Sequence, residues 1–304
     1  MGKIRIPFPQ PKGIKLHYLS DHTWRWTIFL CGLSGIFVLA LVVIFLLRES
    51  WPAFTDIGIW DMVSGTEWRP GKGSFGMLPF IIGSFYLTAL ALVIAVPIGI
   101  MCAIFLAEVA PYRMRQIVRP AIELLVGIPS VVYGLVGMVL LVPQIQKLGD
   151  IHPSLEGYGD SVLAGAIVVS IMILPTIVSI TEDSIRAVPT AYREGALALG
   201  STRWQAMWHA VIPAARSGIL AAIVLGMGRA IGETMAVYMV MGNCLIIPEM
   251  PTDCGRTLTT TPALEIKYAA GLHWNALFAD GIILLVFILL LNSTAMILRR
   301  RQFK

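Results

Sequence analysis

Residues Leu78–Ala107 read LPFIIGSFYLTALALVIAVPIGIMCAIFLA, without one charged side chain. About 20 helical residues cross a hydrocarbon core of about 30 Å, so this stretch is long enough to span a membrane. Closed barrels are built from short strands of alternating polarity, whereas this run is continuously apolar, and it therefore predicts a helix. The stretch places the chain among helical membrane proteins.

Five similar apolar runs accompany it. The chain has 304 residues, of which 57% are hydrophobic and 13% charged, about half the charged fraction of an average soluble domain. Six crossings with their loops leave no room for a sizeable soluble domain. The sequence therefore predicts an all-α membrane protein with six transmembrane helices. The expected spans are Trp26–Leu47, Leu78–Ala107, Ile117–Val142, Ser161–Thr181, Ser217–Met241 and Asn275–Leu298.

The basic residues are divided unevenly between the two sets of connections. Sixteen Lys and Arg residues lie before the first run, after the second, after the fourth and after the sixth, with Arg119 counted among them at the edge of the third run; six lie in the other connections, and Arg229 alone lies deep within a run. Because Lys and Arg gather on the cytoplasmic side, both termini are expected inside the cell. Residues 1–25 then form a cytoplasmic segment, 26–298 the transmembrane domain and 299–304 a basic tail. The charges are scattered singly, so no nucleic-acid partner is expected.

The four cysteines are of two kinds. Cys31 and Cys102 lie in apolar runs, as small hydrophobic residues do. Cys244 and Cys254 share the last external connection with nine residues between them, where a disulfide and two free thiols fit equally well. Neither pair has the spacing of zinc ligands and the histidines (17, 22, 152, 209, 273) form no cluster, so no metal site is expected.

The connection between the fourth and fifth runs has the pattern of a folded knob. Residues Pro189–Ala215 read PTAYREGALALGSTRWQAMWHAVIPAA. Thr190 is expected to cap a short helix that ends at a left-handed turn on Gly200. Thr202, followed three residues later by Gln205, predicts a capping box at the start of a second short helix, which the next proline closes or kinks.

This knob resembles the EAA motif of ABC importer permeases, roughly E-A-A-x3-G-x9-I-x-L-P. Gly195 replaces the first Ala and Ala210 the Ile. The resemblance implies that the region 190–206 is a coupling helix seated in a cleft of a partner ATPase. The alternative is an amphipathic helix that lies on the membrane surface without a partner. The matching residues are Glu194, Ala196, Gly200, Ile212 and Pro213.

Two ionisable residues lie inside the fifth run. Arg229 and Glu233 are four residues apart, which places them on one face of a continuous helix. Burying either alone would cost a few kcal/mol or more, and each reduces the cost of the other. One interpretation is a permanent ion pair that fixes helix packing beside nearby glycines. The other, favoured because charges inside membranes are usually functional, is a transient pair that an anion displaces.

An arginine suits a phosphate-like anion, because its planar fork gives two charge-assisted hydrogen bonds to two oxygens. The third run adds polar groups in IPSVVYG, residues 128–134. Pro129 is expected to bend this helix. Ser130 and Tyr133 then offer hydroxyls to a pathway beside Arg229, or they are satisfied locally as part of a packing kink.

Several segments together make the resemblance narrower. They are similar to PstC-type permease subunits of phosphate-specific ABC importers, and the similarity extends from Trp51 to the C-terminus. TMAV at 234–237 is typical of PstC, where the sister subunit PstA usually has TAPL. The first fifty residues and the Cys244/Cys254 loop fall outside the resemblance. The segments are TEWRPG (66–71), ALVIAVPIGI (91–100), FLAE (105–108), IPSVVYG (128–134) and GRAIGETMAV (228–237).

The resemblance implies a MetI-like type I importer fold in the cell membrane of a bacterium or archaeon. It also implies a PstA-like second permease subunit, a PstB-like ATPase dimer and a PstS-like phosphate-binding protein. ATP and magnesium are then bound by the ATPase, so this chain has no cofactor and is not an enzyme by itself. The alternatives are a permease for sulfate or molybdate and an anion transporter or channel outside the ABC class. A membrane enzyme is least favoured, because no nucleophile–base or metal constellation is present.

Overall fold

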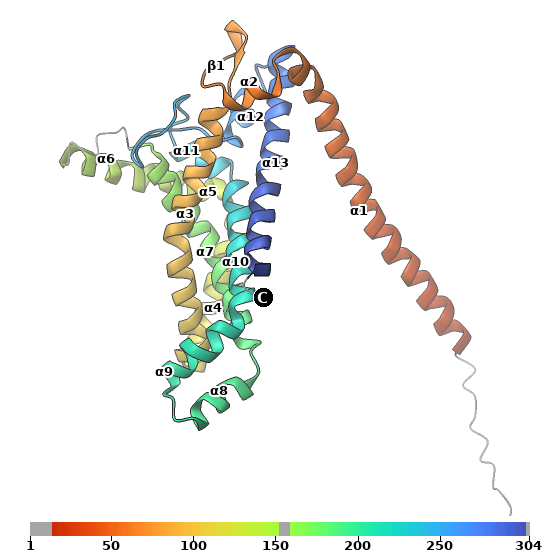
Figure 1. Cartoon of the computed structure of the whole chain (residues 1–304), viewed down its shortest axis with the longest axis vertical. Helices are drawn as coiled ribbons and strands as arrows, with labels where there is room; N and C mark the ends of the chain where they lie inside the picture. Colours follow the sequence, from red (N-terminus) through yellow and green to blue (C-terminus); the bar gives the residue numbers. More distant parts are fainter. Residues whose placement is uncertain (1–13, 152–158, 302–304) are drawn as a thin grey trace, which may run out of the picture. The chain divides into compact units, whose positions relative to one another are not determined.

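The computed structural model describes residues 14–151 and 159–301 (Figure 1). The predicted cytoplasmic segment 1–25 and the predicted tail 299–304 therefore lie partly outside the described residues. His152 lies outside them as well, and so do the side chains of His17 and His22. The chain divides into two compact units at Glu49/Ser50, and each unit is described by itself.

The described part of the first unit, residues 14–49, belongs to one helix, which ends in the second unit. Helix α1, Ile14–Asp56, includes a candidate membrane span, Thr23–Asp56, none of whose apolar side chains is buried against protein in its most hydrophobic window. Side chains such as Ile28, Ile36 and Leu39 are about two-thirds exposed. A helix that is apolar on every face needs lipid or other helices around it, which agrees with a membrane span.

The prediction of six membrane spans is confirmed. Within the described residues, six helical segments are long and apolar enough to cross a membrane. They are Thr23–Asp56, Leu78–Val109, Ser130–Lys147, Val162–Arg186, Arg203–Ile231 and Leu272–Thr294. The corresponding elements are α3 (Leu78–Ile104) with η2 (Phe105–Val109), α5 (Ser130–Val136) with η3 (Gly137–Leu141) and α6 (Val142–Ile151), α7 (Val162–Arg186), α9 (Arg203–Ala206) with η5 (Met207–Val211) and α10 (Ile212–Ile231), and α13 (Leu272–Arg301).

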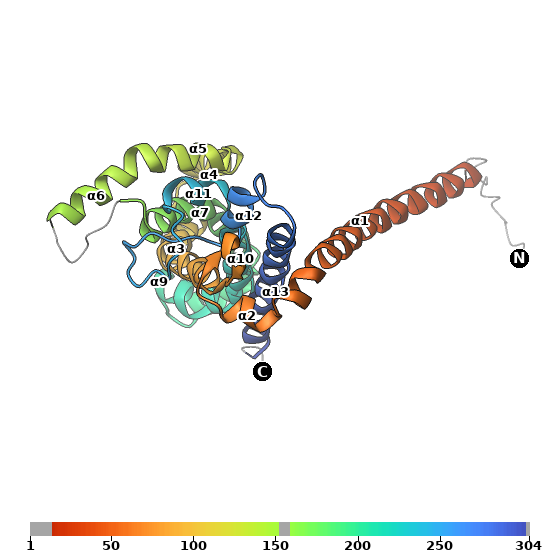
Figure 2. The same ribbon diagram turned by 90° about the horizontal axis from the view of Figure 1, so that it is seen from above.

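The core of the second unit lies where α3, α7 and α10 pack together (Figures 1 and 2). Ile177 of α7 fits between two glycines. A Cβ atom added at Gly99 of α3 would lie 2.8 Å from an Ile177 methyl group, and one at Gly226 of α10 would lie 3.0 Å from its Cγ1. In a membrane, where apolar burial gives little drive for helix association, such close approach supplies dispersion contacts instead. The small residues therefore hold the three helices together.

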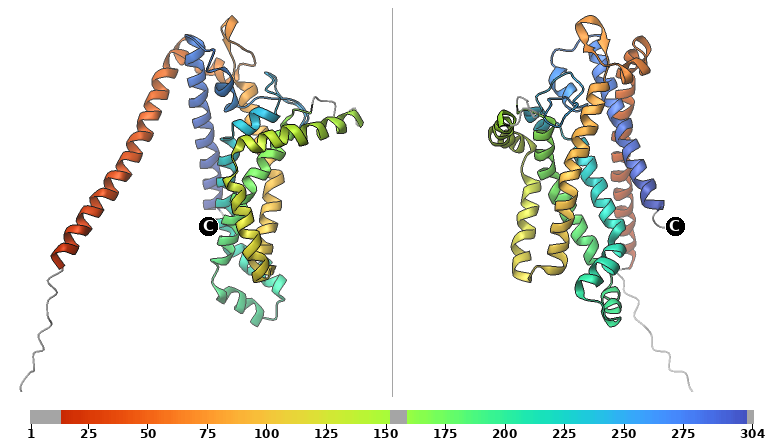
Figure 3. Two further views of the ribbon diagram at one scale, coloured as in Figure 1. Left: turned by 180° about the vertical axis from the view of Figure 1, so that it is seen from behind. Right: turned by 60° about the vertical axis from the view of Figure 1, so that its left-hand side comes forward.

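The third span differs from its prediction. The expected span Ile117–Val142 is divided by a break: α4, Tyr112–Gly127, ends before Pro129, and α5 begins at Ser130. Figure 3 shows α5 continuing beyond α4 before α6 turns aside. The prediction that Pro129 bends a continuous helix is wrong. Its extended backbone (φ −59°, ψ 141°) instead occupies the N-cap position of a new helix. Charged side chains on α4 exclude it from the most apolar segment.

The connection between α7 and α10 forms the predicted knob at one end of the unit (Figures 1 and 3). Helix α8 comprises Thr190–Ala198, and Gly200 has φ +86°. The predicted capping box at Thr202 is present in α9, with both reciprocal hydrogen bonds. The predicted cap at Thr190 is wrong: the extended residue before it, Pro189, occupies the N-cap position without a side-chain bond.

Short elements cover the other end of the unit (Figure 1). Strands β1 and β2 pair antiparallel, with Trp68 opposite Phe75. Trp68 is buried and donates from Nε1 to the Glu265 carboxylate at 2.8 Å. Because Glu265 lies on the element after the last long external loop, this bond ties the hairpin to that loop. The elements are α2 (Ile59–Ser64), β1 (Trp68–Arg69), η1 (Pro70–Lys72), β2 (Ser74–Phe75) and α12 (Thr260–Glu265).

Candidate translocation and coupling sites

The fifth predicted helix is interrupted at its charged residues. The sequence predicts one helix over Ser217–Met241, but α10 ends at Ile231 and α11, Met235–Val240, starts after a break. Arg229 lies in the last turn of α10, and Glu233 lies within the break. The prediction of one continuous helical face is therefore wrong.

Arg229 and Glu233 have separate partners. Arg229 donates from Nη1 to the Thr176 hydroxyl of α7 at 3.4 Å, which is long for a hydrogen bond. Glu233 Oε1 accepts from the backbone N–H of Ala236 at 3.1 Å. Helix dipoles favour a cation near a C-terminus and an anion near an N-terminus, so the break offsets each charge separately. The structure therefore differs from both ion-pair interpretations.

The break is held by a second element. Thr259, just before α12, donates its hydroxyl to the Glu233 carbonyl at 2.8 Å. This bond satisfies a backbone oxygen that would otherwise lie free in a non-helical segment. Sequence reasoning missed Thr176 and Thr259, since a single hydroxyl residue far along the chain gives no pattern that assigns it to a charge.

The two helix breaks lie close together, because α5 packs against α11. A Cβ atom added at Gly134 of α5 would lie 2.9 Å from the Cα of Ala236. Tyr133 lies within the electrostatic reach of Arg229, and its hydroxyl donates to the Leu125 carbonyl at 2.9 Å. That carbonyl belongs to the end of α4, so the Tyr133 hydroxyl is engaged by the local break in this conformation.

The arrangement can hold an anion at the level of the breaks. Arg229 is half-buried and its weak hydroxyl partner leaves most guanidinium donors unused among the described residues. Ser130, at the start of α5, is also half-buried. Non-helical backbone inside a membrane is tolerated where it lies within protein or lines a polar path. Both breaks require such surroundings if they lie at membrane depth.

The five residues that match the EAA motif differ in their exposure to solvent. Glu194, Gly200 and Pro213 are exposed, whereas Ala196 and Ile212 are half-buried. Ile212 packs against the apolar cluster between the cytoplasmic ends of α3, α7 and α10. Pro213 lies in the first turn of α10, directly after the π-helical segment η5, where its missing N–H costs no regular bond. The proline therefore does not close the preceding helix, which continues from α9 and η5 into α10.

The outer surface of the knob is apolar. Leu199 is 91% exposed, and Tyr192 is also exposed. An apolar group beyond the membrane-spanning helices, held by a folded turn, is the kind of surface that seats in a partner protein.

One arginine ties this knob to the membrane helices. Arg193 of α8 forms an ion pair with Glu108 at the end of α3. Its guanidinium also donates to the carbonyls of Ile185 (3.3 Å) and Val188 (3.4 Å) at the end of α7. A displacement of α8 therefore reaches the ends of α3 and α7 directly. The sequence does not predict this ion pair, because 85 positions separate the two residues.

A buried carboxylate joins α4 to α7 nearby. Glu182 is 1% exposed, and its Oε1 lies 2.9 Å from Arg115 Nε and 2.9 Å from Arg186 Nε. Arg119 Nη1 approaches the same oxygen at 3.8 Å. Arg186 also donates to the Leu106 carbonyl at 3.1 Å, which adds the end of α3. Glu182 is thus the common partner of three arginines.

Arg119 has further acidic neighbours. It lies 3.0 Å from Glu123 and 3.1 Å from Asp183. The hydrogen bond to Glu123, with the charges of Asp183 and Glu182, raises the pKa of Arg119 against a smaller lowering by burial. The acidic neighbours therefore stabilise the protonated guanidinium of Arg119.

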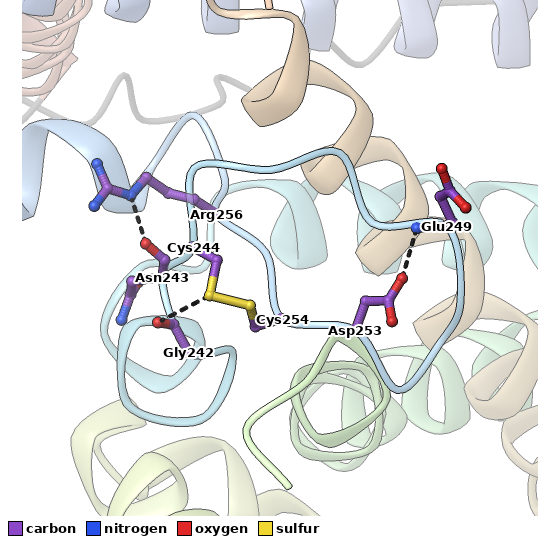
Figure 4. The surroundings of a disulfide bond; sticks show 7 residues. All are labelled: Gly242, Asn243, Cys244, Glu249, Asp253, Cys254 and Arg256. Atoms are coloured by element: carbon purple, nitrogen blue, oxygen red, sulfur yellow. Dashed lines mark hydrogen bonds between the residues drawn. A yellow bond between two sulfur atoms is a disulfide. The ribbon is translucent and has the colours of Figure 1, made fainter. Parts of the chain in front are cut away.

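At the opposite end, a disulfide joins Cys244 to Cys254, with 5.6 Å between their Cα atoms (Figure 4). Asp253 folds the intervening loop by accepting the backbone N–H of Glu249 at 2.8 Å (Figure 4). The loop carbonyl of Asp253 in turn accepts the N–H of Val162 at 2.9 Å. The first N–H groups of a helix have no internal partner, so the loop caps α7.

Within the described residues, no group of three or more His, Cys, Asp or Glu side chains is placed to hold a metal ion. A family model described as "Binding-protein-dependent transport system inner membrane component" matches residues 95–304.

Two relatives align over nearly the whole chain. A "Probable ABC transporter permease protein YqgH" from Bacillus subtilis is 42% identical, covering 90% of each chain. A "Phosphate transport system permease protein PstC" from Pasteurella multocida is 35% identical, covering 95% of this chain and 94% of the relative. These matches confirm the resemblance to this permease family.

Solved transporters share the fold at low identity. The permease of a bacterial alginate ABC transporter, solved with its periplasmic protein, has a TM-score of 0.64 at 18% identity, covering 93% of this chain and 96% of that one. A chain of the MetNI methionine transporter has a TM-score of 0.54 at 16% identity, covering 75% and 94%. The chain therefore belongs to the inner membrane components of binding-protein-dependent transport systems, as a multi-pass permease subunit of an ABC importer whose ATPase is a separate chain.

Proposed function

We propose that this permease subunit imports phosphate, as one half of an ATP-driven translocation pathway. Several relatives at 33–37% identity carry the name of a phosphate transport permease. The observation that carries the proposal is Arg229, a half-buried guanidinium at a helix break whose partner is a distant hydroxyl and not a carboxylate. An arginine without a bound acid keeps its fork available for two oxygens of one anion.

The residues around the breaks have distinct roles in this proposal. Arg229 binds the passing phosphate, and Thr176 holds the guanidinium between passages. Glu233 remains a cap of α11, so its negative charge is directed at a backbone N–H. Ser130 and Tyr133 contribute hydroxyls from α5, with Tyr133 leaving the Leu125 carbonyl when phosphate is present.

The proposed cycle is alternating access. The PstB-like ATPase dimer binds ATP and magnesium and closes; the movement enters through the coupling region 190–206 and passes along Arg193 to the end of α3. The pathway between this chain and a PstA-like second subunit then opens outward. Phosphate delivered by a PstS-like binding protein reaches Arg229 and leaves inward after ATP hydrolysis.

Uptake of labelled phosphate tests this function. Cells that express the chain with its partner subunits should accumulate phosphate, and excess sulfate should not compete. Omitting the ATPase should abolish uptake. Competition by sulfate or molybdate would assign the permease to another oxyanion, and uptake without the ATPase would contradict ATP-driven import.

The coupling role of the knob depends on the turn at Gly200. A valine at φ +86° is strained by about 1–2 kcal/mol, although nothing lies within 4 Å of an added Cβ atom. Gly200→Val is therefore expected to weaken retention of the ATPase at least about fivefold in a pull-down. Gly200→Asn is the matched control, since asparagine tolerates the left-handed region, and it should retain the ATPase. Normal retention by the valine variant would contradict the docking role.

A further inference from the structure

A cavity lies at the cytoplasmic end of the second unit, away from the helix breaks. It has a volume of about 550 Å³ and lies between η2, which continues α3, and the elements α8, α9 and η5. Val109 is the last residue of the second candidate membrane span, and Arg203 is the first residue of the fifth. Both line the cavity, so it opens where two membrane spans end. Leu199, at the exposed tip of the knob, does not line it.

The cavity carries one uncompensated positive charge. Glu108 and Arg193 both line it, and they neutralise one another as an ion pair. Arg203 also lines it, is exposed, and has neither an ion pair nor a side-chain hydrogen bond within the part of the chain that the structure describes. A guanidinium is always protonated in proteins, so the cavity favours an anion.

The rest of the wall is apolar: Ala206, Met207 and Val211 are buried, whereas Val109, Leu197 and Trp204 are exposed. Val109 is 59% exposed and Leu197 is 42% exposed, although both face the cavity. Trp204 is 58% exposed and packs edge-to-face on Trp208, with 5.6 Å between ring centroids. Tryptophan at the end of a membrane span is typical of the headgroup level of the bilayer. An occupant of this cavity therefore meets a cation and an apolar wall together.

We propose that this cavity binds the headgroup and upper acyl chain of an anionic phospholipid of the cytoplasmic leaflet. Arg203 holds the lipid phosphate, while Trp204 and Val109 contact the glycerol and the first methylenes. The volume of the cavity, its free charge and its apolar wall match an amphiphilic anion better than a small soluble one. Because the Arg193–Glu108 pair forms one wall, the lipid lies against the contact that joins α8 to α3.

Brominated lipids test the proposal on the assembled importer in nanodiscs. The Trp204 signal is taken as the difference in fluorescence between the parent and Trp204→Phe. Phosphatidylglycerol brominated near the glycerol is expected to quench this signal at about fivefold lower mole fraction than brominated phosphatidylcholine. That preference corresponds to about 1 kcal/mol for one arginine at an anionic surface.

Variants of Arg203 test whether its positive charge produces the preference for phosphatidylglycerol. Arg203→Gln should remove the preference, whereas Arg203→Lys should keep it. The matched control is Arg113→Gln, which removes an exposed basic residue of α4 that does not line the cavity and should leave the preference unchanged. Equal quenching by the two lipids in the parent, or an unchanged preference in Arg203→Gln, would overturn the proposal. So would an absence of quenching by either lipid, because a partner protein would then fill the cavity.

Discussion

Replacing Arg229 by glutamine is expected to lower phosphate uptake at least about 30-fold while the importer still assembles. Removing one partner of a desolvated charge pair costs about 2 kcal/mol or more, which corresponds to that factor. In the proposed pathway the interaction that is lost is the one between Arg229 and the passing phosphate. The resting contact contributes little, because the partner of Arg229 is only the Thr176 hydroxyl at 3.4 Å. Initial rates of labelled phosphate uptake, normalised to assembled complex, give the measurement.

Two variants separate binding from packing. Arg229→Lys keeps the charge but loses the fork, and we expect an intermediate rate. Thr176→Val removes the resting partner and keeps the shape, so uptake should stay within about threefold of the parent. If Arg229→Gln transported near the parental rate, Arg229 would be a packing residue of α10 and not a phosphate ligand.

Replacing Glu182 by alanine is expected to cause a large loss of stability. Breaking a buried ion pair by removing one partner costs about 3–5 kcal/mol. The lower figure applies here, because the side chains of Arg115, Arg119 and Arg186 are 24–32% exposed and can turn to water. We expect Tm to fall by several degrees in a thermal melt of the purified importer.

The adjacent acidic residue provides the control. Asp183 has a 58% exposed side chain and a single basic partner, Arg119, so Asp183→Asn should change the free energy of unfolding by less than about 1 kcal/mol. Equal shifts of Tm for Glu182→Ala and Asp183→Asn would show that burial of Glu182 does not govern the stability of this cluster.

The membrane spans and the local features of the knob could be predicted from the sequence. The hydropathy of each span follows from the residues of that span alone. The capping box at Thr202 and the left-handed turn at Gly200 each depend on residues within a few positions. Such features are stabilised where they occur in the chain, so their residue types identify them.

The helix break at Glu233 could not be predicted in this way. A run of apolar residues reads as continuous helix, and here the carbonyl freed by the break is satisfied by Thr259, which lies 26 positions away. The Arg193–Glu108 pair and the contacts of Glu182 likewise join distant segments. Charge pairs of this kind are fixed by helix packing, and a single sequence does not specify which helices are neighbours.

The disulfide between Cys244 and Cys254 has a consequence for membrane topology. Disulfides persist outside the cytosol and are rare within it, so an oxidised loop marks the external side of the membrane. The excess of Lys and Arg in the alternate connections assigns the same loop to the same side by an unrelated property of the chain. The disulfide and the distribution of basic residues therefore assign this loop to the same, external side of the membrane. Arg203 and the region 190–206 then lie on the cytoplasmic face.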